Sequence, residues 1–116
     1  TNNHNVLALL GVIALRQDDR GAACEAFTAA VAHADSLLAH TAENYGALDT
    51  KGLALAGLAL CAGPQHLSAA SAAYRAARQI FAGAGIVARV VRLLDALAAA
   101  DTAGILGEVR RAARGE

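Results

Sequence analysis

Two short segments, LALLGVIA at residues 7–14 and LALAGLAL at residues 53–60, decide the fold of this chain. Each carries a glycine in the middle of a pattern in which apolar residues recur at helical spacing, Gly11 in the first and Gly57 in the second. Glycine inside a helix costs about 1 kcal/mol relative to alanine, so its presence at both positions indicates a helix crossing that is too close for a Cβ atom. The two segments therefore predict equivalent helices of a repeated unit.

The helices that follow these two segments also match. Ala23-x3-Phe27-x2-Ala30 is reproduced 47 residues later as Ala70-x3-Tyr74-x2-Ala77, whereas the first segments lie 46 residues apart. The turn at Gly63-Pro64 absorbs this difference of one residue. We expect the alanines to lie where helices touch, and the two aromatic rings to fill the gap between hairpins. The pattern predicts two copies of a helical hairpin.

The composition agrees with closely packed helices. Of 116 residues, 32 are alanine and 16 are leucine, against 7 valines, 4 isoleucines and four aromatic residues. Alanine and leucine favour helices, whereas strands favour β-branched and aromatic residues. The length fits one domain over residues 1–116. We therefore expect an all-α fold of about six helices, because small side chains gain enough packing energy only when helices approach closely.

Turn-forming residues divide the chain into three expected hairpins, over about residues 5–40, 41–82 and 86–114. Thr41 is the expected N-cap of the third helix, Pro64 suits the first turn of the fourth, and Asp101 or Thr102 is expected to cap the sixth. The last hairpin fits the repeat poorly, because Leu94 replaces the glycine and Arg110 the aromatic residue. We expect it to be an atypical capping unit that shields the last apolar face from water.

These residues resemble the tetratricopeptide repeat, in which a large apolar residue and Leu-Gly on one helix are followed by Ala-x3-Phe-x2-Ala on its partner. The resemblance implies a right-handed array of antiparallel helix hairpins, a TPR-like solenoid that binds a protein or peptide in a groove. The repeat interval is 46 to 47 residues, longer than the usual interval of about 34. The additional residues predict longer helices within the same fold.

Three further runs are similar to the C-terminal helical region of actinobacterial regulators of the STAND NTPase class. These runs are KGLALAGLAL at residues 51–60, AYRAAR at 73–78 and GIVARVVRLLDAL at 85–97. The similarity implies a non-catalytic protein-interaction or sensor module of a larger cytoplasmic regulatory protein. The sequence contains no Walker motif, so we expect any nucleotide chemistry to lie in another part of such a regulator.

Projection of the tetratricopeptide pattern onto this sequence predicts a shallow apolar groove with basic flanks. Seven residues are expected to contribute to it: Asn5, Val12, Leu15, Arg16, Lys51, Leu58 and Cys61. Its aliphatic members would provide affinity for a partner segment, and its basic members would orient that segment. The same pattern also fits a face that neighbouring repeats cover, and the sequence leaves both interpretations open.

The distribution of charge raises two alternative functions. The chain has no net charge, but residues 1–50 carry a net −4 and residues 51–116 a net +4. Halves of opposite charge favour head-to-tail contact, so the first alternative is homo-oligomerisation as a structural scaffold. The second is nucleic-acid binding, which needs a basic strip. The candidate strip consists of Arg75, Arg78, Arg89, Arg92, Arg110, Arg111 and Arg114.

Other classes of site find no support in the sequence. No nucleophile, base and acid converge, and the four histidines lack the spacing of a zinc site, so we expect no enzyme, metal or cofactor. Cys24 and Cys61 lie in apolar helical segments, which predicts free thiols in a reducing compartment. No apolar run reaches the length of about 20 residues that a membrane span needs, so we expect no membrane insertion.

Overall fold

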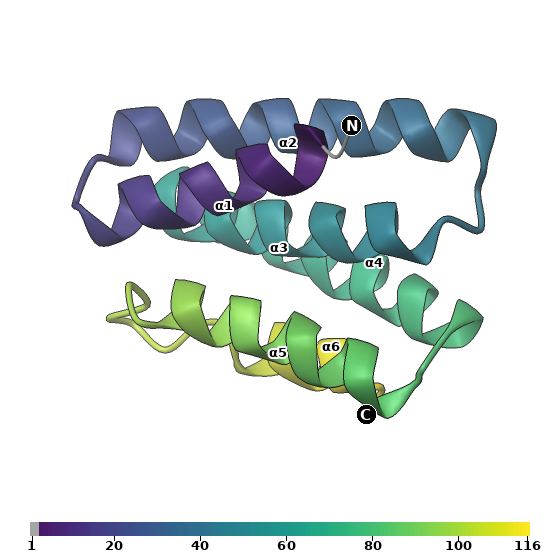
Figure 1. Ribbon diagram of the computed structural model, residues 1–116. Helices are drawn as coiled ribbons and strands as arrows, with labels where there is room; N and C mark the ends of the chain where they lie inside the picture. Colours follow the sequence, from purple (N-terminus) through teal and green to yellow (C-terminus); the bar gives the residue numbers. More distant parts are fainter. Residues whose placement is uncertain (1–2) are drawn as a thin grey trace.

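The computed structural model describes residues 3–116, and every regular element in this range is helical (Figure 1). The elements are α1 (Asn3–Arg16), α2 (Arg20–His40), α3 (Tyr45–Cys61), the short 3-10 helix η1 (Pro64–His66), α4 (Leu67–Ile80), α5 (Ala84–Ala98) and α6 (Gly107–Arg114). This architecture confirms the predicted all-α helical array.

Helices α1 to α4 form two consecutive antiparallel hairpins (Figure 1). Helix α2 packs against α1 and α3, and α3 packs in turn against α4. Helices α1 and α3 also touch each other, so the first helices of the two hairpins share one layer. The alanines predicted to mark helix contacts are fully buried: Ala23, Ala30, Ala70 and Ala77.

One aromatic ring joins the two hairpins. Phe27 of α2 is fully buried, and a Cβ atom on either Gly11 or Gly57 would overlap its ring. The predicted close approach at both glycines is confirmed, but the neighbour is the Phe27 ring rather than the backbone of another helix. The two glycines leave the space that lets α1 and α3 close on the same side chain.

Tyr74 is equally buried but has a different partner. A Cβ atom on Gly52 of α3 would lie 2.8 Å from the Tyr74 ring, whereas Gly57 faces Phe27. The two aromatic residues thus occupy equivalent sequence positions without equivalent contacts, because Phe27 lies between two hairpins and Tyr74 packs on α3 within its own hairpin.

The third pair of helices leaves the pattern of the first four. Helix α6 packs against α4, while α5 lies beside α6 and also contacts α1 and α3 (Figure 1). The buried face of α4 is rich in alanine, and α6 offers the small residues Ala112 and Ala113 to it. Helix α5 instead buries the larger Val90, Leu94 and Leu97. Side-chain size explains why α6, and not α5, approaches α4 closely.

Two expected caps are wrong. The N-cap of α3 is Asn44, whose side chain accepts a hydrogen bond from the Ala47 N–H at 3.0 Å, and Thr41 is instead the C-cap of α2. Helix α6 begins only at Gly107. Asp101 still orders the preceding loop, because its two carboxylate oxygens accept the backbone N–H groups of Ile105 and Leu106 at 3.0 and 3.1 Å.

Candidate functional site

A buried ion pair links three helices at the centre of the molecule. Arg78 Nη2 on α4 donates to Asp49 Oδ2 on α3 at 2.5 Å, and the two side chains are 4% and 9% exposed. Arg78 Nη1 also donates to the carbonyl oxygen of Ala113 on α6 at 3.3 Å. The guanidinium group therefore fixes the position of α6 relative to α3 and α4.

Burial dominates the electrostatics of this pair. Burial raises the pKa of Asp49, although the neighbouring charges of Arg78 and, more weakly, Arg89 oppose that shift. Burial also raises the pKa of Tyr74, and the Asp49 charge adds to that effect. Within the described residues, Asp49 Oδ1 and Arg78 Nε have no hydrogen-bond partner. The charges of Asp49 and Arg78 balance each other, but one oxygen and one nitrogen of the pair remain without a hydrogen-bond partner.

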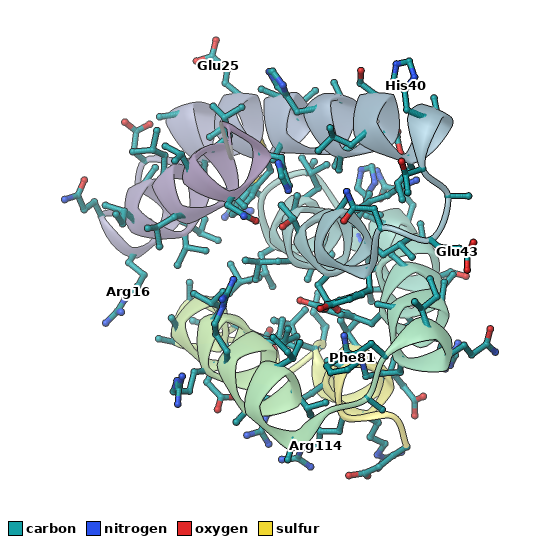
Figure 2. All side chains as sticks on the ribbon, turned by 45° about the vertical axis from the view of Figure 1, so that its right-hand side comes forward. Arg16, Glu25, His40, Glu43, Phe81 and Arg114 are labelled. Carbon is teal, nitrogen blue, oxygen red and sulfur yellow. The ribbon has the colours of Figure 1, made fainter. Side chains whose placement is uncertain are left out.

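A pocket of about 230 Å³ lies between α1, α3 and α5. Figure 2 views the molecule from a side on which side chains of these three helices surround the space. Most of its wall is apolar and comes from all three helices: Leu9, Tyr45, Leu53, Ile86, Val90 and Leu93. Helix α5 closes one side of the pocket, where it contacts both α1 and α3.

Polar groups also line this pocket. Asn5, Asp49, Thr50 and Arg89 all reach its surface. The Thr50 hydroxyl donates to Asn5 Oδ1, which leaves the NH₂ of the Asn5 amide as the free end of that group. Arg89 is exposed and has no acidic partner within the described residues. The pocket therefore presents the Asn5 and Arg89 donors, together with the Asp49 carboxylate, beside an apolar wall.

The outer face of α1 carries an exposed apolar strip, which we define as Val6, Leu9, Leu10 and Ile13. These side chains are 56%, 48%, 50% and 44% exposed. They lie on one side of the helix, opposite Ala8 and Val12, which face the core. Leu9 belongs to both features, because it also lines the pocket. The strip and the pocket thus form adjoining apolar surfaces.

The seven residues predicted to line one groove are dispersed. Asn5 lies in the pocket, whereas Val12, Leu15 and Leu58 are buried in the core. Leu15 and Arg16 also border a second depression between α1, α2 and the end of α5, and Arg16 points outward in Figure 2. Lys51 forms an ion pair with Asp35 at 2.7 Å. Cys61 lies at the end of α3, so the seven residues do not surround a single space.

Cys61 and Cys24 are neighbouring free thiols. Both are partly buried. Burial and the neighbouring Cys24 thiol raise the pKa of Cys61 to about 12. A thiol that stays protonated at neutral pH is a poor nucleophile, so Cys61 has the character of a packing residue.

The arginines do not form the predicted basic strip. Arg78 belongs to the buried ion pair, which contradicts its assignment to a surface strip. Arg110 pairs with Asp95 at 2.7 Å, Arg111 with Glu108 at 3.0 Å, and Arg114 with Glu116 at 3.7 Å. In the part of the chain that the structure describes, Arg75, Arg89 and Arg92 are the members without an acidic partner.

Sequence reasoning missed Asp49 as part of a site and assigned Arg89 to a basic strip instead of a pocket. A signal for Arg78 was present, since it follows Tyr74 by one helical turn and Tyr74 was assigned to the core. A charged residue on a buried face needs a partner of opposite charge. No comparable signal pointed to Arg89, because the contact of α5 with α1 and α3 determines its place.

Between residues 3 and 116, no three histidine, cysteine, aspartate or glutamate side chains are grouped as metal ligands would be. None of the helices in that range is both long enough and apolar enough to span a bilayer. No protein-family model matches the sequence, and neither a curated protein nor a solved structure is significantly similar to it.

Proposed function

We propose that this chain is a non-catalytic protein-interaction module that binds an amphipathic helical segment of a partner along α1. The observation that carries the proposal is the strip of Val6, Leu9, Leu10 and Ile13, four large aliphatic side chains that are each about half exposed. Apolar side chains that adjoin one another on a surface are typical of interaction sites.

The geometry of the strip favours a helix as the binding element. Val6, Leu10 and Ile13 are spaced by one and two turns, which forms the kind of ridge that packs into the groove of another helix. Within the described chain, α1 is packed against α2, α3 and α5, and the strip lies on its remaining side. Residues 6–13 carry no charge, so affinity would come from apolar burial.

Charge would set the direction of the bound segment. Arg16 is exposed at the C-terminal end of α1 and has no acidic partner within the described residues. An acidic residue near one end of the partner helix would pair with it. Lys51 is less suited to this role than the sequence predicts, because Asp35 already engages its ammonium group.

The tetratricopeptide-like pattern and the similarity to STAND-class regulators support a wider proposal. In this proposal the module belongs to a larger cytoplasmic regulatory protein of actinobacterial type, in which α1 receives a helix of another subunit or domain. Because the predicted groove residues are dispersed, the proposed binding surface is the exposed strip of α1 and not the predicted groove.

A displayed library of random peptides tests the binding surface. We expect the enriched peptides to share large apolar residues at helical spacing and to bind the chain with micromolar affinity. Leu10→Asp should abolish binding, because it places a charge in the centre of the strip. The matched control is Ile80→Asp, which alters an exposed aliphatic residue of α4, a helix that is not packed against α1.

Equal binding by the two variants would refute the proposal, as would a failure to enrich any helical pattern. Light scattering of the unliganded chain distinguishes self-association from binding of a different partner. A dimer that Leu10→Asp converts to monomer would assign the strip to a second copy of the chain instead of a different partner. Circular dichroism confirms that each variant retains its helices.

A further inference from the structure

We infer that the pocket between α1, α3 and α5 binds a small apolar monocarboxylate. The pocket adjoins the exposed strip of α1 and shares Leu9 with it, but this inference does not depend on the proposed docking of a partner helix. It rests on the charge, the donor groups and the apolar wall of the pocket.

The charged groups around the pocket leave one positive charge without a partner. Asp49 lines the pocket, but Arg78 neutralises it through the buried ion pair. Arg89 contributes a guanidinium that forms no ion pair within residues 3–116, although its charge also acts on Asp49. A ligand with a single negative charge would balance Arg89, and a guanidinium group binds a carboxylate through two parallel hydrogen bonds.

The neutral polar groups favour the same ligand class. Because Thr50 donates to Asn5 Oδ1, the Asn5 amide is held with its NH₂ as the available group, and this group is a donor. Donors on α1 and α5 that line one pocket suit a carboxylate, whose oxygens only accept hydrogen bonds. A bound carboxylate would connect two helices from distant parts of the sequence.

The rest of the pocket wall favours a ligand that carries an apolar group. Leu53, Ile86 and Val90 form a hydrophobic surface across α3 and α5, and Tyr45 is held by stacking against Phe81 with ring centroids 5.0 Å apart. The pocket volume of about 230 Å³ accommodates a molecule with an apolar group of the size of a phenyl ring or a short alkyl chain.

Titration with 3-phenylpropionate, followed by two-dimensional NMR of the labelled chain, tests the inference. We expect saturable shifts of the Asn5, Thr50 and Arg89 amide signals with a dissociation constant on the order of 1 mM, as is typical of a ligand with few heavy atoms. The neutral analogue 3-phenylpropionamide should bind at least tenfold more weakly, because it lacks the charge. Acetate should also bind at least tenfold more weakly, because it lacks the apolar body.

Two variants separate the donor groups. Arg89→Gln removes the unpaired charge, and Asn5→Asp keeps an acceptor for Thr50 while it replaces the NH₂ donor by a negative oxygen. Each should weaken 3-phenylpropionate binding at least tenfold. Arg92→Gln is the matched control, since it removes an exposed arginine of α5 that does not line the pocket, and it should leave binding unchanged. An acidic residue near a helix N-terminus is favourable, so Asn5→Asp should retain the fold.

Several results would overturn the inference: no saturable shift up to the solubility limit of the probe, equal affinity for acid and amide, or equal effects of Arg89→Gln and Arg92→Gln. A further arm uses a tetrapeptide that ends in phenylalanine with a free carboxylate. If the peptide binds more than tenfold more tightly than 3-phenylpropionate, the pocket recognises a chain terminus and the assignment to a small molecule is wrong.

Discussion

The first four helices and the last two bury their apolar faces in different ways. In α1–α4, small residues let the helices approach, and one ring, Phe27, fills the space between the two hairpins. In the last two helices, α5 buries larger residues than α6; α6 packs onto α4, and α5 packs against α6 and also contacts α1 and α3. The regular part of the molecule provides a scaffold, and the irregular part creates the pocket.

The two regions also differ in how their outer faces are covered. A third regular hairpin would present another open layer to solvent. Here α6 covers α4, and the Arg78 guanidinium joins α6 to α3 and α4 through Asp49 and the Ala113 carbonyl. The cost of this closure is a buried charged pair, which must remain intact for the two regions to stay together.

The largest expected effect concerns the ring at the centre of the regular region. Phe27→Ala should destabilise the chain by about 3–5 kcal/mol, because it leaves a cavity between α1 and α3 that the helices cannot fill. Urea denaturation followed by circular dichroism measures this loss. Phe81→Ala, at a ring that is 40% exposed, is the control and should cost much less. Similar losses for both variants would contradict the role assigned to Phe27.

A double variant sharpens this result. Gly57→Ala alone should be destabilising, because the added Cβ atom would overlap the Phe27 ring. Combined with Phe27→Leu, the same substitution should cost less than the sum of the two single changes, since the smaller side chain leaves room for the Cβ atom. Additive losses would show that glycine serves another purpose at this position.

The second prediction tests the buried ion pair that connects the two regions. Asp49→Asn should destabilise the chain by about 3 kcal/mol, because it leaves the charge of Arg78 buried without a counter-ion. The double variant Asp49→Leu/Arg78→Met should recover most of this loss, since no charge remains buried. Thermal and urea unfolding measure both. If the double variant is as unstable as the single one, the hydrogen bond from Arg78 to α6 is the more important interaction.

The sequence contains the information for the regular region because that information is local and repeated. Gly11, Gly57 and the alanine positions occur twice at nearly the same interval, so each copy supports the interpretation of the other. These repeated positions predict the helical fold class and the burial of the Phe27 and Tyr74 rings. The predicted N-cap of α3 was wrong because Thr41 and Asn44 both have side chains that can cap a helix. Asn44 is the N-cap because it lies three residues before Ala47, whose N–H needs an acceptor.

The pocket could not be predicted in the same way. It depends on the path of α5 across α1 and α3, and no residue pattern within α5 specifies that path. The predicted groove followed the regular repeat, so it assigned Val12 and Leu58 to a surface although α1 and α3 bury both in the core. A departure from the repeat, at Leu94 and Arg110, indicated where prediction would fail but not how the chain would fold there.

The third prediction concerns the loop that lets α6 return to α4. Asp101→Ala should cost about 1 kcal/mol, because the N–H groups of Ile105 and Leu106 lose their acceptor. Hydrogen exchange should become faster at these two amides and remain unchanged in α2. Thr102→Ala removes a neighbouring exposed polar side chain and should have no such effect. Unchanged exchange in the Asp101 variant would mean that the Asp101 carboxylate does not order this loop and that α6 is positioned by Arg78 and by its packing on α4 and α5.

The smallest expected effect is a pH dependence at the start of the regular region. His4 of α1 is buried, and its pKa is lowered by burial and further by the nearby His33. The unfolded chain therefore takes up a proton at this site before the folded chain does, as the pH falls below the ordinary value of 6.5. Stability should be complete above that pH and should decline as the pH falls from it toward the lowered pKa.

Substitution of the buried histidine distinguishes this linkage from general acid destabilisation. His4→Asn should flatten the decline of the unfolding free energy between neutral pH and the lowered pKa, because the titrating group is gone. His40→Asn, at an exposed histidine of α2, should retain the wild-type dependence. If His4→Asn leaves the dependence unchanged, another group that binds protons on unfolding must be responsible.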